Sequence, residues 1–403
     1  MSAPVIFGTH EPGTLAQLAD VATRAERVAL MADGHLGYVM PIGGVAAYRN
    51  KASVVGVGFD IACGNAAIQT DLHAADFSRD DLVSLANGIQ ATISFGVGRT
   101  NLADDAPADD PLFQDPAWDA IPGKGNRAAL WQKATHQLGT VGSGNHYVDV
   151  FVDTSGILWV GVHFGSRGLG HTIASGFLAL GTGADWGDRV KEQEVLLDLA
   201  TPIGDAYWSL MELAGRYAYA GREWVARKVV SLMGGRERRL VHNHHNFAWK
   251  ETHDGEAFVV VRKGATPAFP GQQGFVGGSM GDDAVIVTGV DSGRSRDAMY
   301  STVHGAGRVM GRQDAKRGRA MRDESGKVTG RDESSKITRE MQNDWLKGKG
   351  VILRGGDVDE APQAYRRLPD VLAAQRETIL VIETLTPLVV VMAGHDVRDP
   401  YKD

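Results

Sequence analysis

Gly56-Val57-Gly58-Phe59-Asp60-Ile61-Ala62-Cys63-Gly64 contains the single cysteine of the chain, framed by glycines. A thiol without a second cysteine forms no internal disulfide. The glycines indicate a backbone that is held in unusual conformations or is approached closely by another group. A lone cysteine is often a small buried hydrophobe, so its function depends on the side chains that the fold brings to it. The nearest such group in sequence is the carboxylate of Asp60.

The composition excludes several classes of protein. Lysine and arginine number 42 against 49 acidic residues, so the formal charge is −7 and the chain is not a basic nucleic-acid coat protein, although local basic patches remain open. The N-terminal residues form no signal peptide, and the apolar stretch 380–392, interrupted by Glu383 and Pro387, is too short to span a bilayer. One cysteine and no export signal predict a cytoplasmic location.

Hydrophobic periodicity predicts the main elements. Helices are expected over 14–30, with Thr14 as N-cap, over 205–232 and over 362–377. Strands are expected over 157–163, 258–262, 284–287 and 379–382, with short strands and turns over 40–60. The segment 101–126, rich in Asp, Pro and Gly, reads as an irregular acidic loop and a candidate lid.

The predicted fold class is α+β. Strands and helices do not alternate regularly, no repeat has a fixed period, and no Pro/Gly/Ser linker divides the chain. The candidate functional residues run from Asp60 to His245, so they must converge from most of the fold. This favours one large domain over 1–403, with central β-sheets around a deep cleft.

Five side chains of metal-ligand type lie in glycine-rich or amide-rich strings: Asp60, Cys63, His146, His163 and His245. One thiol, one carboxylate and three imidazoles suit a transition metal such as zinc, manganese or cobalt. Five ligands, one of them a thiolate that can bridge, indicate two ions or one ion with open positions. Any one of these histidines taken alone is more often a hydrogen-bonded core residue.

A second group surrounds His304. In Ser301-Thr302-Val303-His304-Gly305-Ala306-Gly307-Arg308, the imidazole could attack phosphorus, the glycines could admit a phosphate to backbone amides, and Arg308 could clamp it. A basic run that includes Arg312 and Lys316 follows. It is either a solvated helix face or a contact for phosphate or RNA.

Three further strings could bind phosphate. Arg262-Lys263-Gly264-Ala265-Thr266 and Gly277-Gly278-Ser279-Met280-Gly281 are donor-rich loops beside predicted strands, although an ordinary turn explains each one alone. In His163-Phe164-Gly165-Ser166-Arg167, an arginine follows a candidate ligand by four residues, a spacing that fits a phosphorylated end.

These strings together resemble the RtcB family of RNA ligases. The resemblance runs from Met31-Ala32-Asp33-Gly34-His35 to Asp359-Glu360-Ala361-Pro362-Gln363-Ala364-Tyr365, which is most of the chain. It includes Gly142-Ser143-Gly144-Asn145-His146 and His304-Gly305-Ala306-Gly307-Arg308. In combination these motifs are highly specific.

The resemblance implies a GTP-dependent enzyme that joins RNA 3′-phosphate or 2′,3′-cyclic phosphate ends to 5′-hydroxyl ends, in RNA repair or tRNA splicing. It makes the five candidate ligands the holders of two Mn²⁺ ions, bridged by Cys63, and His304 the nucleophile that carries GMP. An archease-like activating partner is a further expectation. The predicted nucleotide-binding residues are Asn145, Asp149, Asn246, Arg262, Lys263, Ser279, Met280, Gly305, Ala306, Gly307, Arg308 and Tyr365. The predicted RNA-binding residues are Arg167, Arg312 and Lys316.

The chain departs from the family pattern at several positions. The usual Asn-Cys-Gly-Val-Arg is Ala62-Cys63-Gly64-Asn65-Ala66, so an arginine is lost. Asp149 replaces a glutamate, Phe164 a small residue and Gly311 a serine. The usual terminal Lys-Gly is absent: Val391-Met392-Ala393-Gly394 takes its place, an extension over 395–403 follows, and Lys402 is a candidate substitute.

Three other hypotheses keep the same residues. The first is a metal-dependent cyclic phosphodiesterase or phosphatase acting on RNA ends without consuming GTP. The second is a non-ligating protein that binds RNA ends and keeps the metals for structure. The third is a ligase that uses another nucleotide, such as ATP.

Overall fold

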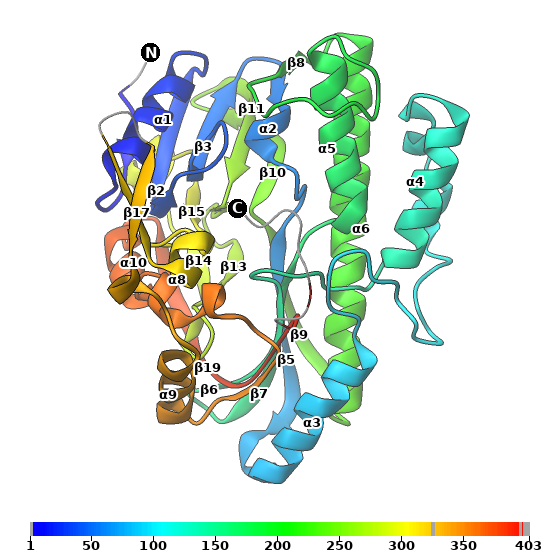
Figure 1. Cartoon of the computed structure of the whole chain (residues 1–403). Coiled ribbons are helices and arrows are strands. Elements are labelled where there is room, and N and C mark those ends of the chain that lie inside the picture. Colours follow the sequence, from blue (N-terminus) through cyan, green and yellow to red (C-terminus); the bar gives the residue numbers. More distant parts are fainter. Residues whose placement is uncertain (1–2, 324–326, 395–396, 398–403) are drawn as a thin grey trace.

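Two large β-sheets organise the chain (Figure 1), in a computed structural model that describes residues 3–323, 327–394 and 397. In the larger sheet the strands follow the order β13 (Gln273–Val276), β14 (Ala284–Gly289), β19 (Ile379–Met392), β6 (Tyr147–Asp153), β7 (Ile157–Phe164), β5 (Gly64–His73) and β9 (Glu237–His244), and β18 (Ile352–Arg354) pairs with β19. In the second sheet the order is β1 (Val5–Ile6), β2 (Arg27–His35), β3 (Ile42–Tyr48), β11 (Glu256–Lys263) and β10 (Asn246–His253).

Three two-stranded pairs complete the β-structure of the described residues. They are β12 (Ala265–Pro267) with β15 (Ser301–Val303), β16 (Arg319–Arg322) with β17 (Val328–Asp332), and β4 (Lys51–Ser53) with β8 (Leu196–Asp198). His245 is the single residue between β9 and β10, so it joins the two large sheets directly. This junction places the ends of both sheets around one space.

Helices cover the sheets. The α-helices are α1 (Pro12–Ala22), α2 (Val54–Val57), α3 (Arg79–Thr92), α4 (Lys124–Gln137), α5 (Arg167–Gly181), α6 (Pro202–Leu232), α7 (Gly293–Asp297), α8 (Arg312–Arg317), α9 (Arg339–Lys349) and α10 (Leu368–Gln375). Short 3₁₀ turns are η1 (Ala74–Asp76), η2 (Pro111–Gln114), η3 (Pro116–Ala120), η4 (Glu333–Ser335), η5 (Val358–Glu360) and η6 (Pro362–Ala364). Figure 1 shows α5 and α6 side by side along one flank, with α4 outside them.

The long helix α6 illustrates how the sequence sets an element. Thr201 caps it by accepting a hydrogen bond from the Gly204 amide, and Pro202 occupies the first turn, where its missing N–H costs nothing. Its apolar face packs on β5 and β7 and buries large side chains such as Tyr207 and Tyr217. The α+β class predicted from the sequence is therefore confirmed.

Several predicted boundaries are wrong. The helix expected over 14–30 ends at Ala22, and 27–35 forms β2 because its apolar run is continuous, as in a strand buried on both faces. The cap is not Thr14, which is buried inside α1; Glu11 stands at the N-cap position without a side-chain hydrogen bond. The helix expected over 362–377 divides into η6 and α10, because Tyr365 is extended and pairs with Arg308.

The segment 101–126 is more ordered than its composition predicts. It contains η2 and η3, and Trp118 is fully buried, with its indole N–H donating to the Leu112 carbonyl at 2.9 Å. Its residues, all of them described, do not line the main cavity. The prediction of a lid is therefore wrong, since this segment packs into the core beside α6.

Candidate functional site

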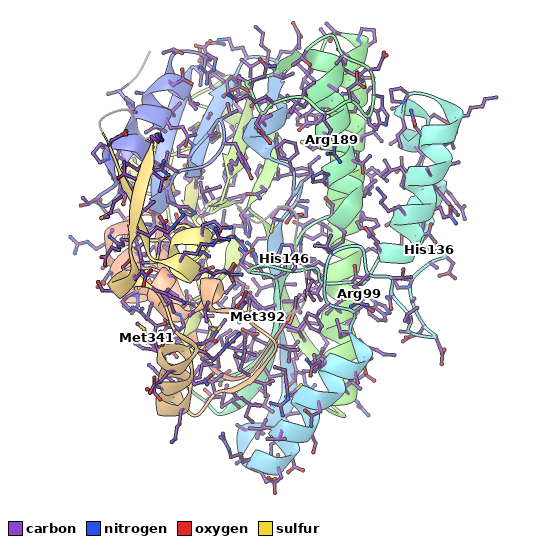
Figure 2. All side chains as sticks on the ribbon, viewed as in Figure 1. Arg99, His136, His146, Arg189, Met341 and Met392 are labelled. Carbon is purple, nitrogen blue, oxygen red and sulfur yellow. The ribbon has the colours of Figure 1, made fainter. Side chains whose placement is uncertain are left out.

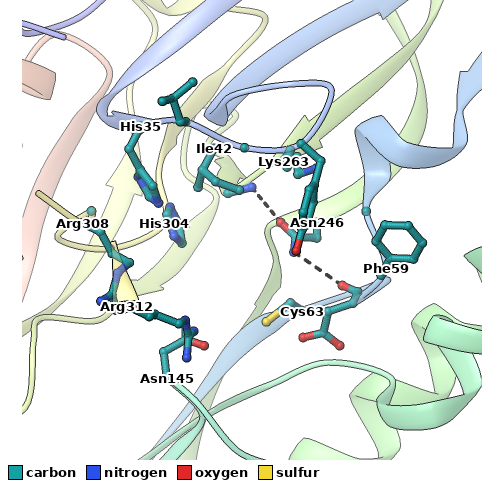
Figure 3. Close-up of a pocket in the computed structure, with 18 of the residues that line it drawn as sticks. His35, Ile42, Phe59, Cys63, Asn145, Asn246, Lys263, His304, Arg308 and Arg312 are labelled. Atoms are coloured by element: carbon teal, nitrogen blue, oxygen red, sulfur yellow. Dashed lines mark hydrogen bonds between the residues drawn. The ribbon is translucent and has the colours of Figure 1, made fainter. Parts of the chain in front are cut away.

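A cavity of about 1660 Å³ lies between the two sheets. The strand order explains which side chains meet in the cavity. Because β6, β7, β5 and β9 are antiparallel neighbours, the starts of β5 and β6 lie beside the ends of β7 and β9, and these strand ends together form one edge of the cavity. Cys63 and His146 immediately precede β5 and β6, His163 lies near the end of β7, and His245 follows β9. Figure 3 shows Cys63 facing the same space as His304 and Asn145.

Three donor atoms converge at this edge. The Cys63 Sγ atom lies 3.8 Å from His146 Nε2 and 3.6 Å from His163 Nε2, and the three donor atoms fall within 4.8 Å of one another. Asp60 Oδ2 lies 3.1 Å from His146 Nε2. The His245 ring stacks at 5.1 Å from the His163 ring, and its buried Nδ1 has no hydrogen-bond partner among the described residues. We call Cys63, His146, His163 and His245 the donor floor.

The donor floor has the electrostatics of a metal site. Burial lowers the pKa values of His163 and His245 well below 6.5, so both imidazoles are neutral and keep a lone pair. Burial opposes the charge on Asp60, but the hydrogen bond to His146 and the nearby positive charges lower its pKa to about 2. Burial raises the pKa of the Cys63 thiol, which a bound cation would counter.

The donor floor fits a transition-metal ion. Sulfur and imidazole donors converge, and the outer nitrogen of His146 is already held by the Val141 carbonyl at 2.9 Å. The orphaned His245 Nδ1 is a further donor without a protein partner among the described residues. Cys63, His146 and His163 could hold one ion, and Asp60 and His245 flank them.

His304 immediately follows β15 and faces the donor floor across the cavity. Its ring lies 4.9 Å from the His245 ring, and its Nδ1 lies 2.6 Å from Oδ2 of Asp33, which is fully buried. The same carboxylate oxygen accepts the backbone N–H groups of His304 and Gly305, at 3.0 and 3.2 Å. Burial works to raise the pKa of Asp33, but His304 outweighs it and the pKa is lowered. Asp33 therefore fixes the ring and leaves Nε2 for chemistry.

The cavity wall beside His304 is rich in charge. Arg308 donates to the Tyr365 hydroxyl at 2.8 Å and to Glu360 at 3.2 Å, and Arg312 lies 2.7 Å from Glu360 and 3.7 Å from Asp359. We call Arg308, Arg312, Asp359 and Glu360 the arginine wall. Figure 3 shows both arginines opposite Asn246 and Lys263.

Most predicted nucleotide-binding residues line this cavity. They are Asn145, Asp149, Asn246, Lys263, Ser279, Met280, Gly305, Ala306, Gly307, Arg308 and Tyr365. The Asn246 side chain accepts the Gly264 N–H at 2.7 Å, and the Ser279 hydroxyl donates to Asp282 at 2.5 Å. Asp149 is buried, and burial raises the pKa of its carboxyl well above 3.8. The Lys263 amine donates to the Val55 carbonyl at 2.9 Å, and burial lowers its pKa to about 8.

Arg262 lies elsewhere, which corrects its prediction as a nucleotide contact. Its guanidinium is fully buried, donates to Glu251 at 2.6 and 3.0 Å, and lies over the Trp249 ring at 4.9 Å. Successive residues of a strand point to opposite faces, so Lys263 faces the cavity and Arg262 faces away from it. The ion pair of Arg262 with Glu251 therefore stabilises the second sheet rather than the cavity.

Two of the predicted RNA-binding residues also lie outside the cavity lining. Lys316 lies 2.5 Å from Asp357 and 3.5 Å from Asp359, and Arg167 donates to the Thr140 hydroxyl at 3.4 Å. Arg312 does line the cavity. Lys402 lies outside the described residues, while Met392 lines the cavity with His146 (Figure 2).

Sequence reasoning assigned no role to two buried residues. Asp33 is a carboxylate at the end of an apolar strand, a signal that could have marked it. Arg222 on α6 is fully buried and donates to the carbonyls of Ala62 and Phe164, the neighbours of Cys63 and His163. Its role depends on how α6 packs against the sheet, which local sequence does not reveal.

No helix in the part of the chain that the structure describes is long and apolar enough to cross a membrane. The fold and the cavity define a mixed α+β protein that gathers a thiol, imidazoles and a histidine–aspartate pair where two sheets meet.

The chain belongs to the RtcB family. The model of that family, described as tRNA-splicing ligase RtcB, matches residues 14–393. The RNA-splicing ligase RtcB of Escherichia coli (strain K12) is 31% identical over 397 residues, covering 91% of this chain and 90% of the relative. The tRNA-splicing ligase RtcB of Thermococcus kodakarensis is 31% identical over 448 residues, covering 90% and 87%. The resemblance inferred from the motifs is therefore confirmed.

Proposed function

We propose that this protein is an RNA ligase that joins 3′-phosphate or 2′,3′-cyclic phosphate ends to 5′-hydroxyl ends, using GTP and Mn²⁺. The relatives that support the reaction class are named RNA-splicing or tRNA-splicing ligases. The observation that carries the proposal is the pairing of His304 with Asp33, with the His304 ring 4.9 Å from a ring of the donor floor. A histidine nucleophile with its far nitrogen held suits phosphoryl transfer.

In the first step, His304 Nε2 attacks the α-phosphorus of GTP. A nitrogen–phosphorus bond forms, the bond from the α-phosphorus to the bridging oxygen breaks, and pyrophosphate leaves. Asp33 holds the proton on Nδ1 and balances the charge that develops on the ring. Arg308 faces the transferred phosphate from the wall.

At a 2′,3′-cyclic end, water first attacks the phosphorus and breaks the bond to the 2′-oxygen, leaving a 3′-phosphate. In the second step, an oxygen of the RNA 3′-phosphate attacks the GMP phosphorus and releases His304, giving an RNA(3′)pp(5′)G end. The 5′-hydroxyl of the other RNA then attacks the 3′-phosphorus, and GMP leaves. Activation is needed because a phosphate monoester has no good leaving group. Arg312 is the proposed contact for RNA phosphate within the cavity, and Arg167 and Lys316 are proposed to contact RNA outside the cavity lining.

When bound, divalent ions supply positive charge that neutralises the phosphate oxygens and so lowers the barrier to nucleophilic attack on phosphorus. We propose Asp60, Cys63, His146, His163 and His245 as their ligands. Burial keeps the imidazoles of His163 and His245 neutral, and the Val141 carbonyl orients the His146 ring. A cytoplasmic role in RNA repair and activation by an archease-like partner complete the proposal.

Incubation with GTP labelled at the α-phosphate, in the presence of Mn²⁺, tests the first step. The protein is expected to become labelled, and His304→Ala is expected to remain unlabelled. His136→Ala is the matched control, because His136 is exposed on α4, away from the cavity (Figure 2). Unlabelled wild type, under conditions that label an RtcB-family ligase, would contradict the proposal, and competition by ATP tests nucleotide choice.

A further inference from the structure

A row of side chains that includes His163 of the donor floor crosses the larger sheet. In the strand register, Asn65 on β5 is the direct partner of His163 on β7 and of Asn243 on β9, and Tyr147 on β6 is the partner of His163 on its other side. Directly paired residues in neighbouring strands project to the same face of a sheet. The row therefore places Asn65 and Tyr147 on either side of His163.

The contacts along this row are specific. The Asn65 Oδ1 atom lies 2.6 Å from His163 Nδ1, and the Asn65 Nδ2 group donates to the Phe275 carbonyl at 2.8 Å. Asn65 is 1% exposed, so water does not compete for these bonds. Tyr147 stacks on the opposite side of His163, with ring centroids 5.4 Å apart and planes inclined by 16°.

These contacts determine the protonation of the ring. A backbone carbonyl only accepts hydrogen bonds, so the Phe275 carbonyl requires the amide nitrogen of Asn65 to face it. The Asn65 oxygen must then face His163, and an amide oxygen also only accepts. His163 therefore carries its proton on Nδ1, and the lone pair of Nε2 points toward Cys63 Sγ, 3.6 Å away.

We propose that Asn65 is a positioning residue that fixes His163 in the Nδ1–H tautomer and aims Nε2 at a divalent metal ion. The inference rests on the proposed metal-dependent function. Groups that orient a ligating histidine in this way change metal affinity by about 10–100-fold.

Three variants separate positioning from stability. Asn65→Leu keeps the shape but removes the contacts to both His163 and Phe275. Asn65→Asp keeps an acceptor for His163 but loses the donor to the Phe275 carbonyl. Asn243→Leu is the matched control. Asn243 lies on the neighbouring strand and accepts the Phe275 N–H at 2.9 Å, so its replacement removes a buried hydrogen bond to the same residue without removing the acceptor for His163.

The test measures the dissociation constants of Mn²⁺ and Co²⁺ by calorimetric titration, together with thermal unfolding. Asn65→Leu is expected to bind about 10–100-fold more weakly than wild type. Asn65→Asp and Asn243→Leu are expected to be destabilised yet to bind within about threefold of wild type. The ¹⁵N chemical shifts of metal-free wild type should show His163 protonated at Nδ1, and Asn65→Leu should show a mixture of tautomers.

The inference is overturned if Asn65→Leu binds these ions like wild type, if Asn65→Asp binds as weakly as Asn65→Leu, or if His163 is protonated at Nε2 in wild type. Should Asn65→Leu fail to fold, the Asn65→Asp titration and the wild-type ¹⁵N shifts still decide the matter. Wild type that binds neither ion contradicts the proposed function itself, which is a separate outcome.

Discussion

The donor floor and the arginine wall face each other across one cavity but are built differently. Side chains of the floor lie at strand ends, where backbone ladders fix their spacing: Tyr147, beside His146, pairs with His163, and Gly64, beside Cys63, pairs with His244. Side chains of the wall lie outside the sheets: Arg308 is on a loop, Arg312 begins α8, and Asp359 and Glu360 belong to η5. Arg308 and Arg312 are held there by Glu360 and Asp359.

This difference separates chemistry from recognition. A ladder of backbone hydrogen bonds does not depend on what enters the cavity, so the floor is arranged before a ligand binds. Carboxylates that pair with arginines can be exchanged for phosphate oxygens, because the guanidinium fork suits both. The departures at Asp149, Gly311 and Met392 lie at the cavity but outside the floor, so substrate choice can change while the metal donors persist.

Replacing Cys63 of the donor floor should have the largest effect on activity. Cys63→Ala should abolish Mn²⁺-dependent RNA joining, because it removes the sulfur on which the two imidazoles converge, while the small buried site tolerates alanine. Arg312→Ala is the matched wall variant. It should keep Mn²⁺ binding, weaken RNA binding and reduce the slope of log affinity against log salt by about 1. A fully active Cys63→Ala variant would contradict the assignment of the metal-dependent chemistry to the donor floor.

Asp33→Asn tests the group that lies between the floor and the wall. The rate of His304 labelling by GTP should fall about 10²–10⁴-fold, because the amide oxygen can still accept the Nδ1 proton but cannot balance the positive charge that develops on the ring. Single-turnover labelling at saturating GTP measures this rate. Mn²⁺ binding should be unchanged, since Asp33 belongs to neither group. An unchanged labelling rate would show that Asp33 only supports the backbone of His304 and Gly305.

The sequence predicted the floor better than its supports. Cys63, His146 and His163 stand in short glycine-rich or amide-rich strings that identify the family, so their convergence could be expected before the fold was known. The contacts that give Asn65 and Asp33 their roles could not be expected, even though Asp33 stands out as a carboxylate in an apolar strand, because they depend on which residue of a neighbouring strand or loop lies opposite. That is a property of strand register and not of local sequence.

Element boundaries failed for similar reasons. Residues 23–30 continued an apolar pattern that fits a helix, yet β2 begins at Arg27, because a strand buried on both faces is apolar throughout. Composition marked 101–126 as a loop but could not reveal that Trp118 anchors it in the core. Local propensity thus gave way to tertiary packing in both segments.

Lys263 at the end of β11 gives a test through pH. Burial lowers its pKa from 10.5 to about 8, so between these values the unfolded chain holds a proton that the folded chain has released. The free energy of unfolding should therefore rise with pH across this window. Lys263→Met should stabilise the protein by about 1–2 kcal/mol at pH 7 and by much less near pH 10. Urea unfolding at both pH values measures the difference, and equal effects would contradict a buried cation.

Gly311, the N-cap of α8, gives the smallest effect and lies next to Arg312 of the wall. It has an extended backbone (φ −62°) and no side-chain cap, and an added Cβ would meet Asp314 Oδ2 only at an ordinary 3.7 Å. Gly311→Ser should supply an oxygen for the first-turn amides and raise the free energy of unfolding by a few tenths of a kcal/mol. Gly311→Ala, which adds the Cβ without the oxygen, should not stabilise. A gain in both variants would mean that the lost entropy of the unfolded chain, and not the cap, is responsible. In either case Mn²⁺ binding should stay at the wild-type value, because the floor is held by strand ladders that do not include α8.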